Sequence, residues 1–307
     1  MKVLFIKKKN IIYFALIILT LLICYPLFIH FKTTQTTETF TPIDNSKITS
    51  IDLTGDGIDD TLKVINKNNN IDIQITSNNR NYSLSTLCED NILLSSTSSW
   101  PIKVFIRNLS RNKVPEIIIQ GTKNKTPLQY IFRWDNGNFI KGFSSNKNIF
   151  GILDFNNNKT PQCYSLNSSS GISSVESFMF IDREYLNITN DSKPIPDIIN
   201  IIQLIDIIQK DYEVQEVPNI FKEGISEAEL GLLWNLDKEF NVYSFQDGFF
   251  YDDSIDNEGN ITSLKWRLTF EKYIKDKDDS SKSEVVFYIT TERTSDMSYK
   301  ISSLYMN

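Results

Sequence analysis

Residues 52–60 read Asp-Leu-Thr-Gly-Asp-Gly-Ile-Asp-Asp, which is the most chemically specific stretch of the chain. Side chains with oxygen atoms stand at alternate positions, Asp52, Thr54 and Asp56, and again at Asp60. This spacing lets a tight loop turn several oxygens toward one centre, and hard cations such as calcium are bound by oxygen ligands. The glycine at the sixth position suits a sharp bend, because glycine adopts positive φ without steric cost.

The loop predicts a structural calcium ion rather than a catalytic one. An EF-hand begins in the same way but closes with a bidentate glutamate at its twelfth position, which is Lys63 here, so an EF-hand is excluded. An acidic surface turn without an ion is the alternative; the ion is favoured because the aspartates otherwise repel one another at close range. The predicted ligands are Asp52, Thr54, Asp56 and Asp60 through their side chains and Ile58 through its main-chain carbonyl.

The loop runs directly into an apolar segment at 62–65, and the pattern Asp-x-x-Gly-Asp-Gly-x-x-Asp before a strand resembles the FG-GAP/VCBS class of extracellular β-repeats. The resemblance implies that the loop connects strands of a propeller blade and holds calcium. Two further copies of the nine-residue pattern follow, at 108–116 and 154–162, and each keeps polar residues at positions one, three, five and nine. The spacing of the copies is about one four-stranded blade.

The later copies carry less negative charge than the first. The second has only Glu116 as a carboxylate, next to Arg111 and Lys113, and the third has only Asp154, next to Lys159. We expect these two loops to keep the turn through Asn and Ser hydrogen bonds instead of an ion. Short alternating apolar runs continue to about residue 190, so the sequence predicts an all-β repeat domain of partial propeller-like blades over residues 47–190.

The N-terminus combines a basic flank with an unbroken apolar run from Ile11 to Ile29. A membrane-spanning helix needs ~20 such residues, and the basic flank stays in the cytoplasm. The sequence therefore predicts a cytoplasmic stub at 1–10, a transmembrane signal anchor at 11–31 and a Thr-rich linker at 32–46. A cleaved signal peptide is the alternative. The predicted localisation is single-pass in a bacterial cell membrane, with the C-terminal bulk extracellular.

Charge and histidine content exclude several classes of function. Residues 1–32 hold five lysines and no acid, so the formal charge of −6 for the chain becomes −11 for residues 33–307. Nucleic acid demands a basic surface and is excluded as a partner. The only histidine is His30, so residues 31–307 contain none. Ser-His-Asp catalysis and His-ligated zinc are therefore excluded for that part of the chain. The sequence leaves open whether Cys88 and Cys163 form a disulfide.

Prolines at 194 and 196 mark a boundary, after which the pattern changes. Isoleucines from Ile198 to Ile208 recur at helical spacing behind Asp197, a predicted N-cap, and Ser226 with Glu229 forms a capping box for a second helix. Alternating apolar strands then run to the C-terminus. Residues 191–307 are thus predicted to be an α+β domain with two helices and an antiparallel sheet, and this order resembles an NTF2-like or cystatin-like domain.

These features favour a non-enzymatic binding or assembly role at the bacterial surface, with an envelope protein or surface polymer as the partner. Two acidic clusters, at 252–258 and 276–279, keep a carboxylate-dependent cell-wall glycan hydrolase as the alternative, although most such clusters are solvated hairpin turns. A structural component of an envelope or sporulation complex is the third possibility.

Overall fold

The computed structural model describes residues 41–307 except 113, 182–183, 211–217 and 278–280. In that part of the chain, no helix is both long enough and apolar enough to cross a membrane. The described residues therefore do not support the single-pass membrane localisation that the sequence predicted. The segments predicted as a cytoplasmic stub and a transmembrane anchor, 1–10 and 11–31, lie outside the described residues.

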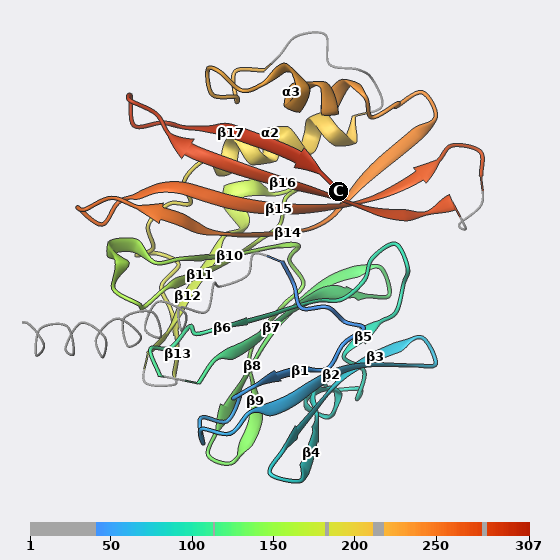
Figure 1. Ribbon diagram of the computed structural model, residues 1–307, viewed down its shortest axis with the longest axis vertical. Coiled ribbons are helices and arrows are strands. Elements are labelled where there is room, and N and C mark those ends of the chain that lie inside the picture. Colours follow the sequence, from blue (N-terminus) through green and yellow to red (C-terminus); the bar gives the residue numbers. More distant parts are fainter. Residues whose placement is uncertain (1–40, 113, 182–183, 211–217, 278–280) are drawn as a thin grey trace, which may run out of the picture. The chain divides into compact units, whose positions relative to one another are not determined.

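Three antiparallel meanders of four strands each build the first part of the described chain (Figure 1). Within each meander, every strand pairs with the next along the sequence. The first has β1 (Thr49–Ile51), β2 (Asp60–Lys67), β3 (Asn70–Ser77) and β4 (Arg80–Ser83), with β5 (Leu94–Ser95) beside β3. The second has β6 (Lys103–Arg107), β7 (Glu116–Lys123), β8 (Thr126–Asp135) and β9 (Asn138–Ser145). The third has β10 (Ile149–Leu153), β11 (Gln162–Leu166), β12 (Glu176–Ile181) and β13 (Glu184–Asn187).

The third meander does not end as a separate blade. Its strand β10 pairs in parallel with β14, and the sheet continues through three more antiparallel strands to give eight strands in the order β13-β12-β11-β10-β14-β15-β16-β17. The predicted propeller-like arrangement is therefore wrong, because the sheets are open and the sheet of the third meander continues with strands from beyond the predicted boundary at residue 190. The long strands are β14 (Asn241–Ile255), β15 (Ile261–Ile274), β16 (Ser283–Arg293) and β17 (Tyr299–Met306).

The meander β6–β9 lies between two hydrophobic cores, which explains its continuous apolar sequence. Ile117 and Ile119 of β7 belong to a core shared with the first meander, whereas Ile118 belongs to a core shared with the eight-stranded sheet. A strand buried on both faces reads as an apolar run rather than an alternation. At the second of these cores, the rings of Phe105 and Phe249 stack with centroids 4.0 Å apart.

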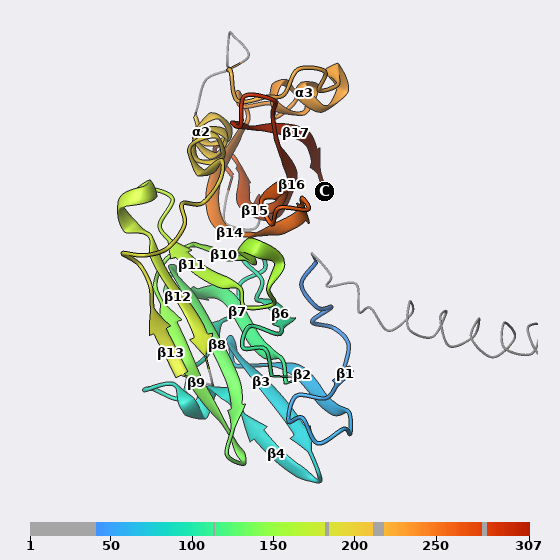
Figure 2. The same cartoon turned by 90° about the vertical axis from the view of Figure 1, so that its left-hand side faces the viewer.

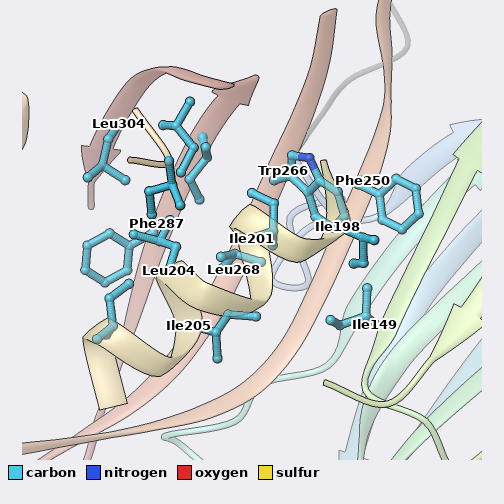
Figure 3. Packing of buried hydrophobic residues seen from close by; sticks show 14 of the residues in the cluster. Ile149, Ile198, Ile201, Leu204, Ile205, Phe250, Trp266, Leu268, Phe287 and Leu304 are labelled. Atoms are coloured by element: carbon cyan, nitrogen blue, oxygen red, sulfur yellow. The ribbon is translucent and has the colours of Figure 1, made fainter. Parts of the chain in front are cut away.

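Two helices cover the opposite face of the long strands (Figures 1 and 2); the sequence predicted both helices but not the face that they cover. The first is α2 (Ile198–Gln209) and the second is α3 (Glu227–Trp234), which begins with the predicted Ser226–Glu229 capping box. Figure 3 shows isoleucines of α2 directed at Trp266 and Leu268 of β15. These side chains belong to the largest core, and they hold α2 on the sheet by hydrophobic burial.

Candidate functional site

The three nine-residue loops occupy the same place in the three meanders. Each loop joins the first strand of its meander to the second, and the residue before the loop pairs with the ninth residue of the loop. The pairs are Ile51 with Asp60, Arg107 with Glu116, and Leu153 with Gln162. The internal repeat read from the sequence is thus present in the backbone as three equivalent hairpin connections.

A common set of hydrogen bonds shapes the three loops. In every copy, the side-chain oxygen at position five accepts a hydrogen bond from the main-chain N–H at position seven, which is an Asx-turn. The N–O distances are 2.8 Å in the first loop, 3.1 Å in the second and 2.9 Å in the third. Aspartate fills position five in the first loop, whereas Asn112 and Asn158 fill it in the others. The geometry therefore depends on a side-chain oxygen and not on a negative charge.

The ninth residue closes the first two loops from inside the protein. Asp60 accepts a hydrogen bond from the main-chain N–H of Leu53 at 2.7 Å, and Glu116 accepts the equivalent bond from Leu109 at 2.7 Å. Both carboxylates are buried, and burial raises the pKa of Glu116 above its usual value. Glutamine replaces the acid in the third loop, where Asp154 at the first position accepts from the N–H of Lys159 at 2.8 Å, as Asp52 does from Gly57 in the first loop.

Two of the predicted calcium ligands, Asp52 and Asp56, accept hydrogen bonds through both carboxylate oxygens. Both oxygens of Asp52 accept hydrogen bonds from main-chain N–H groups of the loop, and both oxygens of Asp56 accept from Ile58 and from the side chain of Asn78. Across the described residues, no group of three or more His, Cys, Asp or Glu side chains is placed to hold a metal ion. Calcium binding by Asp52, Thr54, Asp56, Ile58 and Asp60 stays a prediction from the sequence.

The loops also contact one another in a row. A Cβ atom added to Gly55 in the first loop would lie 2.4 Å from a methyl group of Val114 in the second, so glycine is required for this close approach. Arg111 of the second loop donates a hydrogen bond to the main-chain carbonyl of Asn158 in the third at 2.7 Å. Asn156 of the third then donates to the carbonyl of Gly259 in the β14–β15 turn. These contacts connect the first meander, through the three loops, to the C-terminal strands.

The two acidic clusters of the C-terminal half do not form a paired carboxylate site among the described residues. Asp256 accepts hydrogen bonds from the β14–β15 turn and from Arg293, and these bonds lower its pKa to about 2. Asp253 forms an ion pair with Lys265 at 2.7 Å. In the second cluster, residues 278–279 lie outside the described part. The described members of these clusters act as turn and ion-pair residues.

One carboxyl in this half has a strongly raised pKa. Asp197 precedes α2 in a left-handed conformation, and its side chain does not cap the helix as predicted but accepts a hydrogen bond from the amide of Asn200. Burial raises its pKa to about 7, although Asn200, Lys300 and Thr291 act in the opposite direction. Because the folded chain binds this proton more tightly than the unfolded chain, the associated stability is complete below about pH 4 and is lost as the pH rises through about 7.

Replacing this carboxyl with a neutral amide removes the pH dependence. We expect Asp197→Asn to raise the free energy of unfolding by about 2 kcal/mol at pH 8 and to leave it unchanged at pH 4. Urea melts of both chains at the two pH values measure this difference. Asp237→Asn is the matched control, because Asp237 also has a positive φ but is exposed. An equal gain for both variants at pH 8 contradicts the assignment to Asp197.

Cys88 and Cys163 do not form a disulfide. Both are free and buried, and they belong to different cores. Burial raises the pKa of the Cys163 thiol well above its usual value. A buried thiol with a raised pKa is a poor nucleophile, so Cys163 contributes to packing.

The two ends of the eight-stranded sheet differ in how they are protected. Beyond β17, Phe221 pairs with Ile301, and the carboxylate of Glu229 accepts a hydrogen bond from the main-chain N–H of Leu304 at 3.2 Å. Hydrogen bonds from Ser226 and Ser303 lower the pKa of Glu229 to about 2, so this acceptor stays charged. The edge of β17 is thus covered by the chain itself.

The opposite end of the sheet is the hairpin β12–β13. All four residues of β13 are exposed, and β13 pairs only with β12 within the described part of the chain. Ile181 and Leu186 are exposed on one face, where Leu186 pairs with Met179, while Tyr185 packs against Phe178 on the other. The sequence reading missed this edge, because a four-residue strand gives too short a pattern to show which face is exposed.

Comparisons with known proteins leave the function to be argued from these observations. Neither the family models nor the curated proteins that were searched contain a match to this chain. The resemblances to FG-GAP/VCBS repeats and to NTF2-like or cystatin-like domains therefore rest on the sequence patterns alone.

Proposed function

We propose that the chain is a non-enzymatic binding and assembly protein that adds an extended strand of a partner polypeptide along β13. The observation that carries this proposal is the contrast between the two sheet ends. An uncovered edge strand offers main-chain hydrogen-bonding groups to a second chain, and proteins that do not use such an edge usually cover or charge it. The β17 edge is covered by Phe221 and Glu229, whereas β13 is not covered by any described residue.

The exposed apolar side chains on this hairpin support the same proposal. Ile181 and Leu186 lie on one face of neighbouring strands, where a partner strand or its side chains gain hydrophobic contact. Leu186 has 47% of its surface exposed. Strand addition supplies affinity through the main chain, and such side chains supply specificity.

The hydrolase alternative has less support from the described carboxyls. Glycoside hydrolysis needs two carboxyl groups that flank the glycosidic bond to be cleaved. The carboxyl group that acts as the general acid has a raised pKa. Burial raises the pKa of Glu116 and Asp197, but Glu116 closes a loop of the second meander and Asp197 begins α2. Neither one forms part of a carboxylate pair in a shared cavity.

Site-specific photo-crosslinking tests the proposal. We expect the full-length chain with a benzoylphenylalanine at position 186 to form a discrete adduct in its native cells. The same probe at position 199 is the control, because Ile199 is 66% exposed on α2, away from the proposed edge. Ile181→Lys should abolish the adduct at position 186 by placing a charge beside the edge. Equal adducts at both positions, or none at 186, would contradict assembly along β13.

A further inference from the structure

A pocket lies between the second meander and the long strands, apart from the β12–β13 edge. Its volume is about 570 Å³, which is within the range of small-molecule sites. The walls come from the segment before β6, the β7–β8 turn, the start of β14, Glu271 of β15 and the residue just before β16, Lys282. The lining residues that matter for the argument are Thr97, Ser99, Trp100, Gln246, Glu271 and Lys282.

A buried ionic network fixes the aromatic wall of this pocket. The indole Nε1 of Trp100 donates a hydrogen bond to Asp247 at 2.6 Å, and Lys103 donates to the same carboxylate oxygen at 2.9 Å. Arg267 and Glu284 complete the network behind them. Trp100 is therefore held in one orientation before a ligand arrives, which reduces the entropy lost on binding.

A bulge in β14 places an unsatisfied acceptor at the pocket. The register between β14 and β15 shifts between Phe245 and Asp247, so Gln246 is the extra residue, and bulges of this kind redirect a side chain. Gln246 is only 3% exposed, and its Nε2 donates to the carbonyl of Ser99 at 2.7 Å. Its Oε1 atom is buried and has no hydrogen-bond partner within the described chain. Buried acceptors nearly always have a donor, and this unpaired one belongs to a residue that lines the pocket, so a ligand in the pocket can supply the missing donor.

The charged groups of the pocket indicate a neutral ligand. Glu271 accepts a hydrogen bond from the hydroxyl of Ser99 at 2.7 Å and lies 3.4 Å from the ammonium of Lys282. Lys125 also lines the pocket. A cationic ligand therefore meets two ammonium groups, and an anionic ligand meets the Glu271 carboxylate as well as those ammonium groups. A ligand that carries several hydroxyls avoids both repulsions and matches donors and acceptors together.

We infer that this pocket binds a neutral, hydroxyl-rich ligand, namely a small sugar or the end of a glycan chain. One hydroxyl of the sugar donates to Oε1 of Gln246, and a second donates to Glu271. The ammonium of Lys282 donates to a sugar oxygen, and the C–H face of the ring packs on the indole of Trp100, whose apolar body suits such contact. No bond is made or broken, so the pocket is a binding site.

Ligand-observed NMR on the full-length chain tests this inference. The panel consists of glucose, N-acetylglucosamine, maltose and cellobiose, with lysine and citrate as charged comparisons. We expect saturation transfer to the C–H protons of at least one sugar, and a shift of the Trp100 indole N–H signal on titration. This signal is assigned by its loss in Trp100→Phe. The indole signal of the unsubstituted chain gives a readout that does not depend on the folding of a binding-site variant.

A matched pair of glutamine variants locates the site. Gln246→Met should weaken sugar binding at least tenfold, whereas Gln120→Met should leave it within twofold. Gln120 is a suitable control because it is equally buried, donates to a main-chain carbonyl at 2.9 Å and also has an unpaired Oε1, but it does not line the pocket. The inference is overturned if no sugar binds, if lysine or citrate binds instead, or if both variants lose binding equally.

Discussion

Gly151→Ala should lower the free energy of unfolding by about 3 kcal/mol or more, because it overpacks the joint between the two halves of the eight-stranded sheet. Gly151 of β10 pairs with Phe250 of β14, and an added Cβ atom would lie 2.0–2.3 Å from three carbons of the Phe250 ring. That ring is fully buried and stacks on Trp266 with centroids 4.2 Å apart, so it has no free space into which it can move.

Denaturant unfolding followed by tryptophan fluorescence measures this loss. Gly231→Ala is the control, since Gly231 lies inside α3 and the nearest atom to an added Cβ is 3.8 Å away. That control should be neutral or stabilise the chain by up to about 1 kcal/mol, as alanine is the better helix former. A loss below about 0.5 kcal/mol for Gly151→Ala is incompatible with the packing described.

The second large effect is expected at the buried ionic network. Lys103 is only 1% exposed and forms ion pairs with Asp247 at 2.9 Å and Glu284 at 3.2 Å. Lys103→Met keeps a similar length but removes the cation, leaving Asp247 buried with less compensation. Breaking a buried pair from one side costs about 3–5 kcal/mol, and we expect a loss in this range.

Two further chains distinguish this cause from lost packing. Lys103→Met combined with Asp247→Asn should regain most of the stability, because the amide still accepts from Trp100 but carries no charge. Lys47→Met removes an exposed lysine paired with Asp44 at 3.0 Å and should change stability by less than about 0.5 kcal/mol. Chemical denaturation of the four chains gives the comparison, and a double variant as unstable as Lys103→Met alone argues against the electrostatic explanation.

Features with a local cause were predictable from the sequence. The three loops follow from Asx-turns and from residues that tolerate positive φ, and α3 follows from a capping box that lies within four residues. The turn at 135–138 is another example, where Asn136 and Gly137 both have positive φ between β8 and β9. In each case the deciding interactions connect residues that are close in the chain.

Features that depend on distant residues were not predictable. Nothing near Gly151 indicates that it pairs with Phe250, so the sequence reading separated the third meander from the C-terminal strands. Lys103 looks like a solvent-exposed strand residue until Asp247 is placed beside it. Gln246 has no pattern of its own, because the bulge that directs it exists only once β14 pairs with β15. The pocket could therefore not be predicted from the sequence.

The parallel pairing of β10 with β14 also sets an order for folding during synthesis. Ile149 pairs with Gly248, 99 residues later, whereas the meanders β1–β4 and β6–β9 each need only neighbouring strands. Those two meanders can form while the ribosome is still synthesising the rest of the chain. The edge of β10 that pairs with β14 stays unpaired until β14 has been synthesised. A ribosome that stalls before residue 241 leaves that edge available to other nascent chains, so slow translation of this interval favours aggregation over folding.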